Sequence, residues 1–288
     1  MFRWMRGSWP RWSPWCWERQ RRSQAIIHAL DLLFNPGTKI TKRLSELFAG
    51  DIELLKRAYL AMENKNTLLS NDYNGAVFDR ILDLDPAFIT KYIAWKYENA
   101  EHGWVSRHDD DRDYAFLWAR PDHREVMDRV VESIYEYGRN PFISSDYLSV
   151  FFGNKQGRKA PSEETQGRQD TYLLRLIDQR TGDVRFMEYL FDVISRFPPE
   201  RRILFVERFV RHNKNFDAFE RLPLGPSSRS WIGSTVPLLQ KDLDYWESLL
   251  PIMNTVDLLR HKQYVERYIQ GLRAEMAREK KKDFIEDA

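Results

Sequence analysis

Cysteine and long apolar runs are scarce in this sequence. Cys16 is the only cysteine in 288 residues, which excludes a disulfide framework or a thiolate zinc site within one chain. No stretch approaches the roughly 20 apolar residues of a membrane-spanning helix, and no apolar N-terminal core precedes a small-residue cleavage site. We therefore expect a cytoplasmic location, with neither a secretion signal nor a membrane span.

Sequence motifs of known chemistry are also missing. The loop of residues 225–230, GPSSRS, has neither the glycine spacing nor the Lys-Ser/Thr pair of a phosphate-binding P-loop. No Gly-x-Ser-x-Gly pattern marks a nucleophilic serine. These absences predict no cofactor, and they make an enzymatic role the less favoured interpretation.

An excess of charge of one sign is absent from the body of the chain. The formal net charge is +2, from 45 Lys and Arg against 43 Asp and Glu. Residues 1–22 alone hold six arginines and one glutamate, so the rest of the chain is slightly acidic. A basic face is the usual mark of nucleic-acid binding, and we therefore expect none in the body.

Residues 1–22 differ from the remainder, because they contain five of the ten tryptophans with arginines between them. Tryptophan with arginine suits a lipid headgroup layer or stacking on single-stranded nucleic acid. The abrupt change of composition at Ser23 favours instead a disordered tail or a non-native leader. Membrane contact is expected only through this segment, if anywhere.

What the body does contain is helical periodicity. Apolar side chains recur every three or four positions in residues 51–62, 121–137 and 183–197. Asp85-Pro86, Pro121 and Pro199 predict helix starts, because aspartate caps a helix and proline fits its first turn. Alternating strands are not evident, and we predict an all-α fold.

Residues 78–86 and 191–199 share the pattern Phe-Asp-x-Ile-x4-Pro. The recurrence predicts stacked helical hairpins, an α-solenoid of the HEAT or TPR kind. An irregular helical bundle is the alternative, because two copies without a strict period are weak evidence. We expect N- and C-terminal helical subdomains at residues 23–152 and 170–288, joined by a polar loop or linker at 153–169.

The C-terminal stretch contains Trp231-Ile232-Gly233-Ser234, Leu249-Leu250-Pro251 and His261-Lys262-x-Tyr264-Val265. It resembles the helical C-terminal region of large bacterial multidomain ATPases of the STAND type. In that family a helical repeat array follows the nucleotide-binding core and senses a partner. The resemblance implies that this chain is the C-terminal part of a larger protein, with no activity of its own.

One loop offers groups for metal chemistry. Imidazole and carboxylates together can bind a divalent metal and activate water, and the candidate ligands are His102, His108, Asp109 and Asp113. This pattern predicts a metal-dependent hydrolase as the alternative function. Adjacent aspartates in a loop cannot all point at one ion, so a solvated loop of mixed charge is the favoured interpretation.

The function that the sequence favours is a non-enzymatic helical-repeat module that binds a protein partner. Arg229 and Trp231, in the long connection at residues 221–235, are the predicted contacts. Arginine and tryptophan are typical anchors of protein interfaces. The partner's identity and the oligomeric state do not follow from the sequence.

Overall fold

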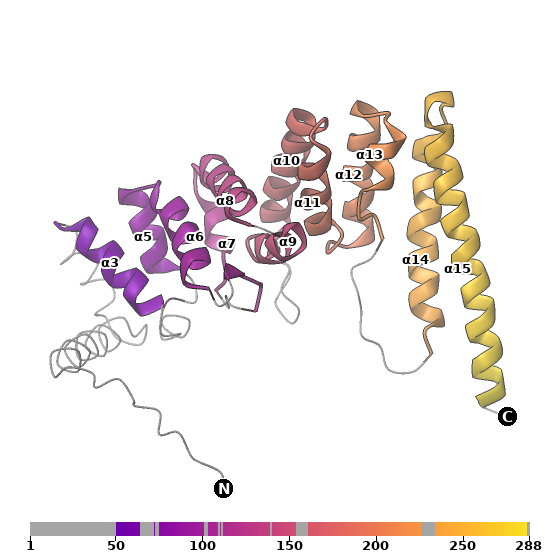
Figure 1. Ribbon diagram of the computed structural model, residues 1–288, viewed down its shortest axis with the longest axis horizontal. Coiled ribbons are helices and arrows are strands. Elements are labelled where there is room, and N and C mark those ends of the chain that lie inside the picture. Colours follow the sequence, from indigo (N-terminus) through magenta and orange to yellow (C-terminus); the bar gives the residue numbers. More distant parts are fainter. Residues whose placement is uncertain are drawn as a thin grey trace, which may run out of the picture. The chain divides into compact units, whose positions relative to one another are not determined.

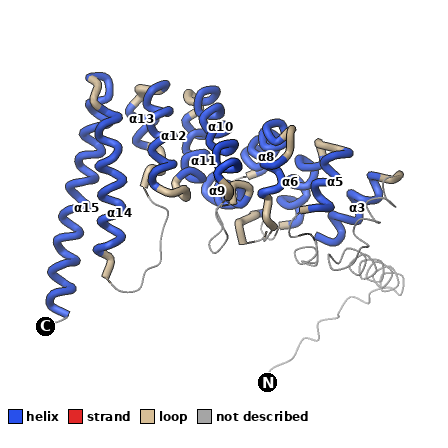
Figure 2. Tube along the Cα trace, turned by 180° about the vertical axis from the view of Figure 1, so that it is seen from behind, coloured by secondary structure: helices blue, strands red, loops and turns tan. Residues whose placement is uncertain are grey.

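The computed structural model describes residues 50–63, 72, 75–100, 103–108, 110, 112–138, 140–153, 161–225 and 234–286. These residues form α-helices joined by turns and short 3-10 segments, with no strand among them (Figures 1 and 2). The prediction of an all-α fold is confirmed. In this described part of the chain, no helix combines the length and the apolar character that crossing a membrane requires.

The chain divides into two compact units, residues 1–88 and 89–288. In the first unit, α3 (Ile52–Glu63) packs against α5 (Ala76–Leu84). Tyr59, Phe78 and Phe88 form a buried aromatic cluster, with ring centroids 5.4–6.1 Å apart. The buried carboxylate of Asp72 accepts the N–H of Val77, so it caps the start of α5.

Asp85 ends α5, and the sequence-based start of the next helix at Asp85-Pro86 is displaced by two residues. The helix α6 (Phe88–Asn99) begins after a turn. The Asp85 carboxylate accepts the N–H of Ala87 at 3.1 Å and the Lys56 ammonium at 2.6 Å. Its oxygens therefore stabilise the corner and the contact with α3 instead of capping a helix that starts at Pro86.

The remaining helices of the second unit follow in close succession. They are α7 (Ala115–Ala119), α8 (His123–Tyr137), α9 (Pro141–Val150), α10 (Glu163–Arg180), α11 (Val184–Ile194), α12 (Pro199–His212), α13 (Phe216–Glu220), α14 (Val236–Leu249) and α15 (Leu259–Glu286). Pro199 is the first residue of its helix, as predicted, whereas Pro121 lies in a turn before α8. Residues 163–169, within the predicted linker, form the first turns of α10 behind the cap Ser162.

Within this second unit helices pack on a sequence neighbour, on the helix two positions along the chain, or on both. The helices α8 and α9, α10 and α11, and α14 and α15 are in contact as sequence neighbours. The helix α10 packs on α12, α12 on α14, and α9 on α11 (Figure 1). Two layers of helices follow from these contacts, one containing α10, α12 and α14 and the other α9 and α11.

The repeated sequence pattern marks helix ends in both places. Phe78 and Ile81 are buried on α5, and Phe191 and Ile194 are buried on α11. A turn and a second helix follow each time, as predicted. The copies differ at the proline, which begins α12 in the second copy but precedes α6 by two residues in the first.

In the described part of the second unit, eight ion pairs between elements have the acidic residue on the earlier helix and the arginine on the later element, whereas Arg107–Asp146 and Lys214–Asp257 have the opposite order. The eight pairs are Asp128–Arg175, Glu132–Arg180, Asp146–Arg196, Asp170–Arg201, Asp178–Arg208, Glu188–Arg221, Asp217–Arg260 and Glu247–Arg273. Partly exposed pairs contribute little stability each. The pairs connect helices that lie side by side.

Candidate functional site: an anchored loop and two surface clefts

The candidate metal ligands fall between residues 102 and 113 of the sequence. His108 is exposed, and its backbone N–H donates to Ser106 Oγ at 3.2 Å. Asp113 accepts the N–H of Ala115 at 3.0 Å, at the start of α7. His102 and Asp109 lie outside the described residues. Among the residues that are described, no three His, Cys, Asp or Glu side chains are grouped closely enough to hold a metal ion.

Asp110, in the middle of the same loop, is fully buried. Its Oδ2 accepts the hydroxyl groups of Tyr114 at 2.6 Å and Tyr92 at 3.3 Å, and it lies 3.6 Å from Lys96 Nζ. Burial raises the pKa of the Asp110 carboxyl, but Lys96 and Arg112 outweigh it and hold this pKa below its usual value. Asp110 is therefore a charged anchor of the loop on α6.

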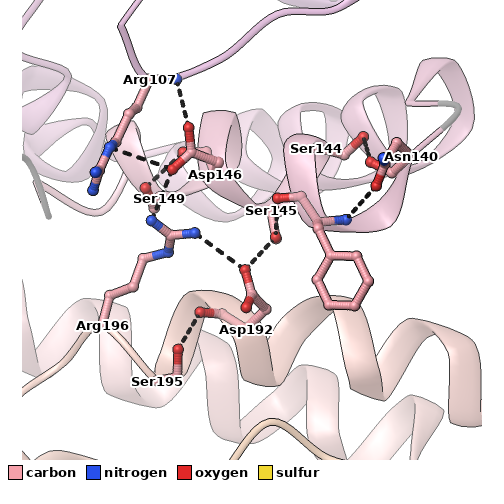
Figure 3. A network of polar contacts seen from close by, with 10 residues as sticks. Arg107, Asn140, Ser144, Ser145, Asp146, Ser149, Asp192, Ser195 and Arg196 are labelled. Atoms are coloured by element: carbon pink, nitrogen blue, oxygen red, sulfur yellow. Dashed lines mark hydrogen bonds and ion pairs between the residues drawn. The ribbon is translucent and has the colours of Figure 1, made fainter. Parts of the chain in front are cut away.

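A second polar network holds the loop on α9 and α11 (Figure 3). The Asp146 carboxylate accepts the backbone N–H of Arg107 at 3.1 Å and the Arg196 guanidinium at 2.8 Å. The other side of that guanidinium binds Asp192, which also accepts a short hydrogen bond from Ser145 Oγ. Arg196 thus bridges an aspartate on each helix, and the loop backbone is attached to the bridge.

The described carboxylates of this region already have partners within the chain. Asp110 and Asp146 face ammonium or guanidinium groups, and Asp113 is engaged by a backbone N–H. A carboxylate that is already bound to cations is a poor ligand for a further cation. What the described geometry supports is a structural role for Asp110, and sequence reasoning missed that this aspartate is fully buried.

A cleft of about 760 Å³ lies where α7, α8 and α10 meet. Its lining includes Arg120, His123, Arg124, Gly167, Arg168 and Thr171. The Arg120 guanidinium binds Asp122 at 2.8 Å and lowers the pKa of that carboxyl. Arg168 donates to the Trp118 carbonyl at 2.6 Å and pairs with Glu164.

Arg124 differs from the other cations of this cleft. It is exposed, and within the described parts of the chain it has neither a hydrogen bond nor an ion pair through its side chain. A free guanidinium at the rim of a cleft can bind a carboxylate through two parallel hydrogen bonds. The cleft therefore contains one guanidinium without an ion pair, that of Arg124, beside Arg120 and Arg168, which are each paired with a carboxylate.

A second groove, of about 500 Å³, follows α15 beside α13. Tyr264, Tyr268 and Leu272 form its apolar stripe. Tyr268 stacks on the buried Trp246 of α14 at 4.3 Å, and yet 46% of its surface is exposed. An aromatic ring fixed on one face and open on the other is typical of a contact surface.

The two glycines that occur inside the described helices each line one of these cavities. Gly167 lies on α10 in the first cleft, and Gly271 lies on α15 in the second groove. A Cβ atom added at either position would meet nothing within 4 Å. Glycine costs about 1 kcal/mol in a helix relative to alanine. Packing within the described chain therefore does not require either glycine.

The predicted contacts Arg229 and Trp231 lie outside the described residues, so their placement stays a prediction. Comparison with known proteins gave no match: no family model, no curated protein and no solved structure is similar to this chain. The interpretation of its surface therefore depends on its own residues.

Proposed function

We propose that this chain is a helical interaction module of the cytoplasm that binds a protein partner on the surface of its stacked hairpins. The observation that carries the proposal is the cleft at the start of α8 and α10, with its helical glycine and its free Arg124. Clefts of this size lined by mixed apolar and polar groups are the usual sites of recognition. No described geometry favours the metal-dependent hydrolase over this function.

The chemistry of the cleft indicates what kind of segment it accepts. Arg120 and Arg168 are held by Asp122 and Glu164, so they shape the walls more than they attract charge. Arg124 is the group left for a partner. A partner segment with one carboxylate, placed beside small or apolar residues that approach α10 at Gly167, satisfies both features.

The proposal also includes two predictions that were made from the sequence and that the described contacts do not test. Arg229 and Trp231 are proposed as a secondary contact near the start of α14. Sensing of a partner by a helical array is also what the resemblance to the STAND-type C-terminal region implies. A double Arg229→Ala, Trp231→Ala variant that retains normal partner binding would remove these two residues from the proposal.

The test compares two glycine variants in capture of partners from the native organism's lysate. Gly167→Gln fills the cleft and favours the helix, so loss of folding does not confound the result. Gly182→Gln makes the same change in the turn after α10, where a Cβ atom also meets open space. We expect a stoichiometric partner with the wild type and Gly182→Gln, and roughly tenfold less with Gly167→Gln.

Charge reversal at Arg124 provides an independent check on the same surface. Arg124→Glu replaces an exposed side chain that makes no described ion pair, so the fold is expected to be unchanged. It is predicted to lose the same partner that Gly167→Gln loses. Equal capture by the wild type, Gly167→Gln and Arg124→Glu would contradict binding at this cleft.

A further inference from the structure

On the exposed side of α15, residues that line the groove are spaced alternately by four and three positions. Tyr264, Tyr268, Gly271, Glu275 and Arg278 follow one another at these intervals, and all five line the groove beside α13. This is the spacing of the seam along which two helices pack in a coiled coil. The seam spans about 21 Å at 1.5 Å per residue, and in the described chain the groove above it is open.

Side chains that α15 contributes to this groove, including Arg267 beside the seam, are arranged symmetrically about Gly271. Arg267 lies four residues before the glycine and Glu275 four residues after it, with opposite charge. Tyr264 lies seven residues before and Arg278 seven residues after. In two antiparallel helices that cross at one position, residues equally far before and after the crossing face each other.

The groove is thus complementary to itself. Around a crossing at Gly271, Arg267 of one copy faces Glu275 of the other, and the same contact forms a second time by symmetry. Arg278 then faces Tyr264, a cation over an aromatic ring, and lies near Glu220, the groove residue of α13. Within the described chain none of Arg267, Glu275 and Arg278 has an ion-pair partner.

We propose that a second copy of this chain occupies the groove, with the two α15 helices antiparallel and crossing at Gly271. The groove contains acidic and basic side chains, so a purely acidic or a purely basic partner could pair with only some of them. A second copy of the chain supplies an opposite charge for each charged side chain of the groove. The absence of a side chain at Gly271 lets the two backbones approach closely at the crossing. This contact is separate from partner binding at the Gly167 cleft.

The experiment is sedimentation equilibrium of the full chain, from about 1 to 200 μM, with a charge-swap series. Arg267→Glu and Glu275→Arg each place like charges opposite one another at two symmetry-related contacts. We expect each to weaken dimerisation by roughly tenfold or more. The double variant Arg267→Glu, Glu275→Arg restores both pairs and is expected to dimerise within about threefold of the wild type.

Glycine variants complete the series. Gly271→Gln puts a side chain into the crossing and favours the helix, so it is predicted to yield a folded monomer. Gly167→Gln makes the same change outside the groove and is predicted to dimerise like the wild type. A monomeric wild type throughout the concentration range would overturn the proposal and leave the groove for another occupant. Failure of the double variant to recover would overturn the antiparallel register.

Discussion

Asp110 and Asp113 lie three residues apart in one acidic run, and their environments are opposite. Asp110 is buried among Tyr92, Lys96 and Tyr114, whereas Asp113 accepts a single backbone N–H. The sequence shows the run of carboxylates but not their burial, because Tyr92 and Lys96 come from a helix that precedes the loop. Two carboxylates of one run therefore differ in their surroundings: Asp110 is buried and stabilises the fold, whereas Asp113 is partly accessible to solvent.

The first prediction concerns these two aspartates. Asp110→Asn removes a buried charge from two cations, and we expect the free energy of unfolding to fall by about 3 kcal/mol. Asp113→Asn retains a hydrogen-bond acceptor at a helix start, and it should cost less than about 1 kcal/mol. Urea unfolding of both variants measures the difference. Equal losses would contradict the anchoring role of Asp110.

The second prediction concerns His261, which is buried on α15 against the rings of Phe216 and Phe219. Burial lowers the pKa of the His261 imidazole, Lys214 and Arg260 lower it further, and Asp257 opposes them. The unfolded chain therefore binds a proton more readily than the folded chain. Stability is expected to be complete above pH about 6.5, the ordinary value for histidine, and to decline as the pH falls below it.

The check on His261 is thermal unfolding of the wild type and His261→Leu between pH 5 and 7.5. Leucine keeps apolar volume in contact with the two phenylalanines and cannot be protonated. The variant should lose the part of the pH dependence that lies just below pH 6.5. An unchanged slope would show that other groups cause the dependence.

At the scale of elements, helix existence followed from the sequence better than helix boundaries did. The apolar stripes of α3, α8 and α11 predicted these helices because burial of a periodic face requires a helix. The helix starts predicted at Pro121 and at Asp85-Pro86 were wrong, because α8 begins at His123 and α6 begins at Phe88. The carboxylates that could have capped the helices bind Arg120 and Lys56 instead, and such tertiary partners are not visible in a local pattern.

The order of the ion pairs was also beyond sequence reasoning. Asp178 and Arg208 are 30 residues apart, and Asp146 and Arg196 are 50 residues apart. Helices and loops of unequal length make these separations irregular, so no fixed period connects an acid with its arginine. The two clefts were equally hidden, although Gly167 and Gly271 stood inside helical patterns, where an isolated glycine can mark a functional position.

The third prediction contrasts two glycines at helix positions. Gly167→Ala meets open space on α10, so we expect stabilisation by about 0.5–1 kcal/mol. Gly138 ends α8 at a place without room for a side chain. In Gly138→Ala the new Cβ atom would lie 1.7 Å from Ser144 Oγ and 2.6 Å from the Ile134 carbonyl oxygen. We expect this substitution to destabilise the protein by about 1–3 kcal/mol. Calorimetric melting temperatures should move in opposite directions.

At the scale of the whole molecule, the all-α class was predictable, whereas the expected subdomains at 23–152 and 170–288 stay a prediction. Composition and periodicity exclude a sheet-based fold, but the boundary at Phe88 and Ile89 has no linker composition to announce it. The described residues 161–169, at the end of the expected linker, belong to the second unit. Of the candidate metal ligands that are described, Asp113 accepts a backbone N–H and His108 is exposed, so their role in metal binding stays a prediction.

Binding of a protein partner at the cleft of α7, α8 and α10 is the function that we propose for this molecule. Hydrogen–deuterium exchange of the full chain, with and without the captured partner, tests it most directly. We predict slower exchange at the start of α8 and in the first turns of α10 around Gly167, with the Gly182 turn unchanged. Protection that leaves both of those helix starts unaffected would contradict it.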